Sequence, residues 1–164
     1  MLRTALFILM LLCFLFVSNV MVGSLNAVQG QTVRRGSPER LKKYVDGDPW
    51  KLLKDAEVRS RLRLILGRDL KRFEQQLGQA ELPELKGDIL IVRGGVPQLF
   101  TLMEAVFAVD LSNGKYYAGI LDQERLDFYG PASNQKDLPE AVQQWLEDLK
   151  RRKGSSIDVS FHVK

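Results

Sequence analysis

Histidine and cysteine, the side chains that most often carry nucleophilic or metal chemistry, are almost absent from this sequence. The 164 residues include one cysteine, Cys13, and one histidine, His162, two positions before the C-terminus. Cys13 lies inside an apolar N-terminal stretch that resembles an export signal, so the rest of the chain has no thiol for a disulfide, a zinc site or a nucleophile. These counts predict a non-catalytic protein with no metal and no cofactor.

Five acidic residues come nearest to a catalytic cluster. They lie on or beside predicted strands: Glu104, Asp110, Asp122, Glu124 and Asp127. A glycosidase needs two carboxyl groups on either side of the scissile bond. Asp110, Asp122 and Glu124 instead fall at predicted turns, where acidic side chains usually cap or solvate the backbone. The sequence has no nucleophile elbow, phosphate-binding glycine loop or metal-ligand spacing, so an envelope hydrolase is the weakest of the functional hypotheses.

The first 27 residues have the layout of a secretory signal. Arg3 precedes an unbroken apolar run over residues 5–17, and small and polar residues follow up to Ala27. This order predicts a signal peptide over residues 1–27. The alternative is a retained anchor, because the apolar run can be extended to Val22. Both interpretations place the remainder of the chain outside the cytoplasmic membrane.

Hydrophobic spacing predicts helices at both ends of the exported chain. Residues 28–47 are mostly polar and predict a flexible lead-in, after which Asp48 and Pro49 provide a helix cap and a first helical residue. From there to Gly78 the apolar residues recur at helical spacing. A second amphipathic pattern over residues 138–149 predicts a closing helix.

Four apolar runs between these helices predict strands joined by short turns. The runs cover residues 89–92, 105–111, 116–121 and 125–129. Asn113-Gly114 between the second and third is a strong hairpin signal. We therefore expect an α+β fold, an antiparallel β-meander with helices packed on one face, over residues 48–153. Residues 154–164 form a C-terminal tail whose alternating pattern could add an edge strand.

Charge is distributed unevenly along the chain. Residues 28–78 hold 13 Lys/Arg and 7 Asp/Glu, residues 79–149 hold 5 and 12, and residues 150–164 hold 5 and 1. The acidic sheet half and the expected compartment argue against a nucleic-acid partner. The acidic half would attract a cationic protein, and the basic run 150–153 would make weak contact with an anionic membrane surface. The alternative is internal charge complementarity between layers of one domain.

The connection between the first two predicted strands is longer than a hairpin needs, so it predicts a shaped loop. Its candidate partner-binding residues are Gly95, Val96, Pro97, Gln98, Leu99 and Phe100. Two interpretations stay open. The loop either folds back onto the domain or forms an exposed apolar plug for a partner or for a second copy of the chain.

Several segments of this chain occur in the order and spacing of a known family. They are Pro49-Trp50-Lys51-Leu52-Leu53-Lys54-Asp55, the Gly-x-Pro loop, residues 104–115, Tyr117-Ala118-Gly119, and the Leu138-Pro139 entry into the Trp145-Leu146 helix. With these segments the chain resembles the inhibitor of vertebrate lysozyme (Ivy) family of exported Gram-negative proteins, from about Trp50 to Leu149. The resemblance implies a periplasmic binding protein whose partner is a basic lysozyme or muramidase.

In that family the loop typically reads Cys-Lys-Pro-His-Asp-Cys, is closed by a disulfide, and places its His against the two catalytic carboxylates of lysozyme. Here only Pro97 is kept. Gly95 and Phe100 stand at the two Cys positions, Gln98 replaces the His and Leu99 the Asp. The resemblance thus implies a divergent member with a looser loop and weakened inhibition. The alternative is an envelope structural or assembly protein that forms a homodimer through the apolar loop.

Overall fold

The computed structural model describes residues 37–154 and 157–164. The predicted signal peptide, residues 1–27, and the first part of the predicted lead-in lie outside these residues. Among the described residues, no helix is both long and apolar enough to cross a membrane. The helices are η1 (Pro38–Tyr44), α2 (Pro49–Lys54), α3 (Ala56–Leu66), η2 (Gly67–Asp69), α4 (Leu70–Leu77), η3 (Gln135–Asp137) and α5 (Glu140–Lys153).

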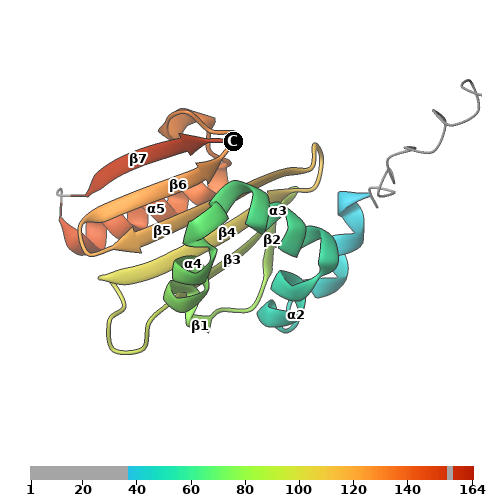
Figure 1. The fold of residues 1–164 in the computed structure, drawn as a ribbon, viewed down its shortest axis with the longest axis horizontal. Helices are drawn as coiled ribbons and strands as arrows, with labels where there is room; N and C mark the ends of the chain where they lie inside the picture. The colour runs from blue at the N-terminus through green and yellow to red at the C-terminus, as the bar shows by residue number, and fades with distance from the viewer. Residues whose placement is uncertain (1–36, 155–156) are drawn as a thin grey trace, which may run out of the picture. The chain divides into compact units, whose positions relative to one another are not determined.

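The strands form one seven-stranded sheet in the order β1-β3-β4-β5-β6-β7, with β2 also paired to β3. They are β1 (Gln79–Ala80), β2 (Glu84–Lys86), β3 (Ile89–Gly95), β4 (Met103–Asp110), β5 (Lys115–Asp122), β6 (Arg125–Gly130) and β7 (Asp158–Val163). Strands β3 to β6 are the predicted antiparallel meander, and β7 runs parallel to β6 (Figure 1). The predicted α+β class is therefore confirmed.

The capping and turn residues noted in the sequence lie at the ends of these helices and strands. Asp48 caps α2 by accepting a hydrogen bond from the backbone N–H of Trp50, at 2.8 Å. Gly67 and Gly78 end α3 and α4 with positive φ angles of 54° and 28°. Such backbone favours glycine because a Cβ would meet the following carbonyl oxygen. The hairpin after β4 is confirmed, although its turn has four residues and only Gly114 has a positive φ, of 68°.

Helices cover both faces of the sheet, which corrects the prediction that they pack on one face. Residues from α2, α3 and α4 share one core with side chains such as Phe107 and Ile120. On the opposite face Trp145 and Leu146 of α5 share a second core with Val106, and Figure 1 shows α5 behind the sheet with α3 and α4 in front. Because β6 and β7 are parallel neighbours, the chain between them has to return to the starting end of β6 across one face of the sheet. The helix α5 is part of this crossover and therefore covers that face.

The packed part of the chain extends into both predicted flanking segments. Leu41 of η1, within the predicted lead-in, is fully buried. Arg40 donates to both oxygens of the Asp55 carboxylate, at 2.7 Å each, and this joins η1 to the start of α3. At the other end, β7 is formed by residues of the predicted tail.

Candidate binding finger

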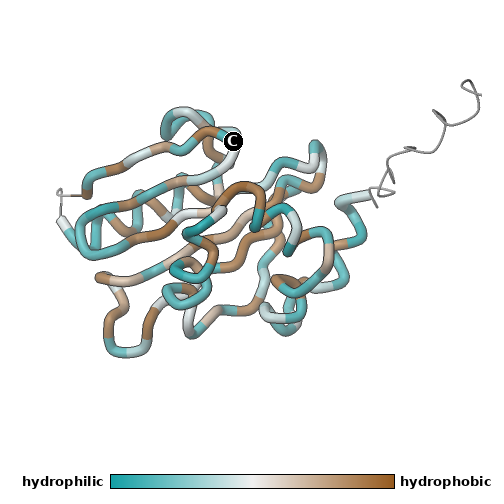
Figure 2. The backbone as a smooth tube through the Cα atoms, in the orientation of Figure 1, coloured by the Kyte–Doolittle hydropathy of each residue, from teal (hydrophilic) through white to brown (hydrophobic). Residues whose placement is uncertain are grey.

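The predicted loop is a protrusion between β3 and β4, called the finger below and defined as residues 96–102. Gly95 is buried at the end of β3, and Val96 is half-buried. From Pro97 to Phe100 every residue is exposed, with exposed fractions of 39% for Leu99 and 42% for Phe100. The finger extends away from the sheet (Figure 1), and its limbs are hydrophobic beside a polar tip (Figure 2). The loop thus stands clear of the domain and does not fold back onto it.

Two successive β-turns build the finger. The N–H of Leu99 donates to the Val96 carbonyl at 2.9 Å, and the N–H of Leu102 donates to the Leu99 carbonyl at 2.9 Å. The third residue of each turn has a positive φ, 67° for Gln98 and 78° for Thr101. This backbone is unfavourable for any residue with a Cβ and most of all for a β-branched one. Such strain persists only where surrounding contacts hold it, and it concentrates at functional sites.

Gly95 and Phe100, at the positions that the resemblance equates with a disulfide, lie in contact. A Cβ added to Gly95 would lie 2.7 and 2.8 Å from two atoms of the Phe100 ring. The ring therefore covers the bare glycine backbone at the base of the finger. This contact closes the loop without a covalent bond, because the missing side chain of Gly95 leaves room for the ring.

An ion pair between a buried carboxylate and a partly exposed arginine holds the other end of the finger. Glu104, 5% exposed, accepts a hydrogen bond from the N–H of Thr101 at 2.8 Å. Arg152 in the last turn of α5 donates to both carboxylate oxygens of Glu104, at 2.6 and 3.0 Å. These hydrogen bonds raise the pKa of Arg152 above its ordinary value. A paired, two-point contact of this kind fixes geometry as well as charge.

A second contact runs through the neighbouring β5–β6 turn. The N–H of Gln123 donates to the Leu102 carbonyl at 2.7 Å, and Lys153 of α5 donates to the Gln123 carbonyl. Lys150 donates to Gln135 at 2.9 Å. Three cations of the basic run 150–153 thus bond to other groups of the same chain. This leaves less positive charge for a contact between the run and a lipid surface.

An open groove of about 600 Å³ lies between the finger and these cations. Its lining residues are Thr101, Leu102, Gln123, Glu124, Arg152 and Lys153. The groove extends the exposed surface of the finger toward the end of α5. A partner that contacts the finger would therefore also meet polar and charged side chains here.

Three of the acidic residues singled out in the sequence, Glu104, Asp110 and Asp127, have separate surroundings. Glu104 faces α5, whereas Asp127 faces α4 and contacts Arg72, so these two carboxylates lie on opposite faces of the sheet. Asp110 accepts hydrogen bonds from Ser112 and Asn113 in the turn after β4. Glu104 and Asp127 therefore do not form a pair of carboxylates across a shared cleft, and Asp110 stabilises the turn after β4.

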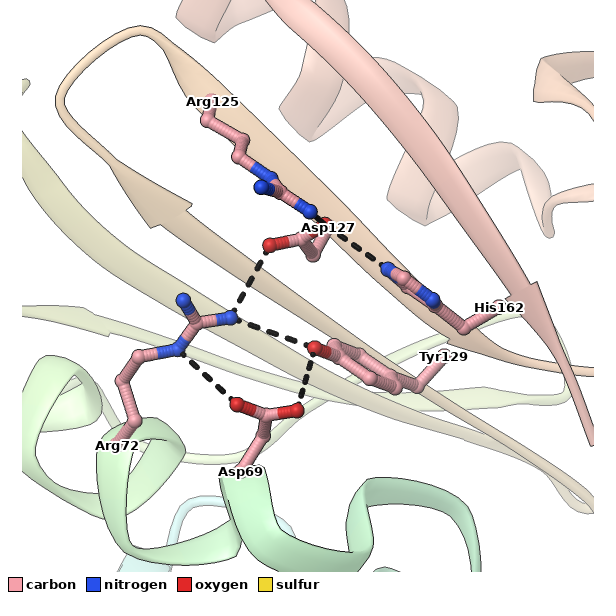
Figure 3. Close-up of polar contacts among 6 residues, drawn as sticks. All are labelled: Asp69, Arg72, Arg125, Asp127, Tyr129 and His162. Atoms are coloured by element: carbon pink, nitrogen blue, oxygen red, sulfur yellow. Dashed lines mark hydrogen bonds and ion pairs between the residues drawn. The ribbon is translucent and has the colours of Figure 1, made fainter.

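Asp127 is the centre of a polar network that the sequence did not reveal (Figure 3). It is 2% exposed and contacts His162 at 2.9 Å, Arg125 at 3.0 Å and Arg72 at 3.1 Å. Burial alone would raise the pKa of Asp127, but the hydrogen bonds from His162, Arg125 and Arg72 hold it below its ordinary value. The ring of Tyr129 stacks on that of His162 with 4.6 Å between centroids.

This network joins elements and does not form a catalytic triad. Burial, together with the hydrogen bond that its O–H donates to Asp69 at 3.0 Å, raises the pKa of Tyr129 to about 12, so that hydroxyl is no base near neutrality. The donors to Asp127 come from α4, β6 and β7, and no Ser or Thr hydroxyl of the described residues is hydrogen-bonded to His162. In the part of the chain that the structure describes, no group of three or more acidic, His or Cys side chains could hold a metal ion.

Comparison with known proteins adds one match. No curated protein and no solved structure matches this chain. The family model described as "Inhibitor of vertebrate lysozyme (Ivy)" matches residues 57–152, more than half of the chain. The matched range contains the whole finger, Glu104 and Arg152, and the members of this family are non-catalytic inhibitors. This chain is therefore a member of the Ivy family, with the α+β fold described above and no enzymatic activity.

Proposed function

We propose that this protein is exported to the periplasm and binds a lysozyme or muramidase through the finger. The observation that carries the proposal is the exposure of residues 97–100 within the family-matched range. The strained turns and the contacts at the base of the finger also support it, because a segment held in one conformation loses less entropy on binding.

The binding is expected to be weak and dependent on salt. Gln98 can donate a hydrogen bond to a catalytic carboxylate but carries no charge, so the contact lacks the strength of a charge-assisted one. Residues 79–149, which include the finger, hold 5 Lys/Arg and 12 Asp/Glu. A basic lysozyme would be drawn to this segment at low ionic strength, and the attraction would be screened as salt rises.

Replacement of Gln98 by His is expected to strengthen the binding of a vertebrate-type lysozyme about tenfold at pH 6 and low salt, because a protonated imidazole donates a charge-assisted hydrogen bond. Inhibition of lysozyme activity, titrated with wild type and variant, measures the change. Gln144→His on the exposed surface of α5 is the matched control and should leave inhibition unchanged. If neither wild type nor Gln98→His alters lysozyme activity at high micromolar protein, the lysozyme hypothesis is wrong.

Self-association is the second candidate function, favoured by three exposed apolar side chains on the finger. The exposed fractions are 39% for Leu99, 42% for Phe100 and 45% for Leu102. In this hypothesis the finger buries these side chains against a second copy of the chain.

The double variant Leu99→Asp/Phe100→Asp separates the two candidates. If the finger pairs two copies, wild type sediments as a dimer and the variant as a monomer in analytical ultracentrifugation. Leu64→Asp on α3, where Leu64 is 66% exposed, is the matched control and should not change the sedimentation. A wild type that is already monomeric at 100 μM (about tenfold above a 10 μM Kd) would contradict self-association, whereas loss of lysozyme inhibition in the double variant would support the first proposal.

A further inference from the structure

We propose that the last turn of α5 positions the finger, with Arg152 acting through Glu104 and Lys153 acting through Gln123. Arg152 and Lys153 are positioning residues in this proposal, since they hold the finger and need not touch the partner. The consequence for lysozyme binding depends on the function proposed above, whereas the effect on the finger's conformation does not.

The first step is the burial of Glu104. A carboxylate that is 5% exposed loses most of its hydration, and this is unfavourable unless cationic or N–H donors replace the lost water. Arg152 supplies two such hydrogen bonds, although it is 48 residues away in the sequence. The carboxylate is therefore kept in place by the end of α5.

The second step is the hydrogen bond between the finger and that carboxylate. Thr101 has a φ of 78°, a conformation that a β-branched residue rarely adopts. Its N–H donates to Glu104 at 2.8 Å, and this bond favours the strained turn over more relaxed ones. If Glu104 lost Arg152, the carboxylate would be drawn toward solvent and Thr101 would lose its anchor. Arg152 thus stabilises the conformation of the finger from a distance.

The third step is the tie through the β5–β6 turn. Gln123 has a φ of 55° and donates its N–H to Leu102, at the end of the finger. Lys153 donates to the carbonyl of the same Gln123. Two adjacent cations of α5 therefore hold the two consecutive finger residues Thr101 and Leu102, each through one intermediate residue.

Hydrogen exchange of individual amides, followed by NMR, tests the proposal on the folded protein. Arg152→Ala is expected to raise the exchange rate of the Thr101 amide about tenfold, because a charge-assisted anchor is lost. Arg152→Lys keeps the charge but not the two-point geometry and should raise this rate a few-fold. Arg151→Ala, at the exposed neighbouring residue, is the matched control. Ala118, in the middle of β5 and 1% exposed, reports on the core.

Exchange that accelerates at Thr101 but not at Ala118 supports the proposal. Equal acceleration at both amides, or no acceleration at Thr101 in either Arg152 variant, overturns it. Should Arg152→Ala not fold, the outcome for Arg152→Lys decides in the same way.

Covalent closure of the finger provides the rescue experiment. Oxidised Gly95→Cys/Phe100→Cys joins the two residues that now touch, and its formation is checked by counting free thiols. In the Arg152→Ala background it should return lysozyme inhibition to the level of the same disulfide with Arg152 intact. Persistent loss of inhibition in the rescued variant would contradict a positioning role. Selective exchange at Thr101 combined with no lysozyme binding by wild type would instead retain the positioning role and reject the proposed partner.

Discussion

Replacement of Asp127 by Asn is expected to lower the free energy of unfolding by about 3 kcal/mol at pH 7. The carboxylate is 2% exposed and is shared by Arg72, Arg125 and His162, so its neutralisation leaves the partly buried guanidinium of Arg72, the exposed one of Arg125 and an imidazole without their common partner. Urea denaturation of wild type and variant measures the difference. Asp158→Asn, at an exposed position on the neighbouring strand β7, is the matched control and should change stability by less than about 0.5 kcal/mol.

The effect of Asp127→Asn should disappear in acid. Because the folded pKa of Asp127 lies below its ordinary value, this group stabilises the fold at every pH above about 4, where the unfolded carboxyl is ionised. The contribution is lost as the pH falls through the folded pKa, where the native carboxylate also takes up a proton. A stability difference between wild type and variant that stays constant from pH 6 to pH 2 would show that the charge of Asp127 does not stabilise the network.

Gly94→Ala is expected to destabilise the protein by about 3 kcal/mol, at the upper end of the usual cost of overpacking. A Cβ at this position would lie 2.2 Å from the Leu77 carbonyl oxygen, 2.8 Å from that of Gln79 and 2.9 Å from the Cα of Ala80. All three are backbone atoms, so α4 or β1 would have to move away from β3. Thermal unfolding followed by circular dichroism measures the loss.

The adjacent glycine offers a matched comparison. At Gly95 an added Cβ would meet mainly the Phe100 ring, at 2.7 Å, and a side chain on the exposed finger can rotate away. Gly95→Ala should therefore cost less than about 1 kcal/mol while displacing the ring from the base of the finger. Equal destabilisation by the two substitutions would mean that backbone crowding around Gly94 does not limit the fold.

The Asp127 network and the Glu104–Arg152 pair have separate roles in this interpretation. The Asp127 network ties α4 to β6 and β7 on one face of the sheet, and its loss is expected to affect stability. The Glu104–Arg152 pair lies on the other face, beside the finger, and its loss is expected to affect recognition. Variants of the Asp127 network should therefore lower the free energy of unfolding, whereas variants of the Glu104–Arg152 pair should weaken the binding of the partner.

Local patterns in the sequence were sufficient to predict most of the helices and strands. Alternation and apolar runs predicted β3 to β6, helical spacing predicted the segments on either side, and Gly67 and Gly78 mark helix ends in the structure. These features depend on residues within a few positions of one another, so side-chain periodicity and backbone preference determine them. The order of motifs likewise indicated the Ivy family, which the family model confirms.

Only the tertiary structure decided which distant residues meet. The placement of α5 on the second face and the parallel pairing of β7 follow from a crossover that local patterns do not specify. That crossover brings His162 to Asp127, 35 residues apart, and Arg152 to Glu104, 48 residues apart. Each of the two buried carboxylates therefore acquires a hydrogen-bond partner from the C-terminal part of the chain, because sheet register and helix docking, not sequence spacing, fix these distances.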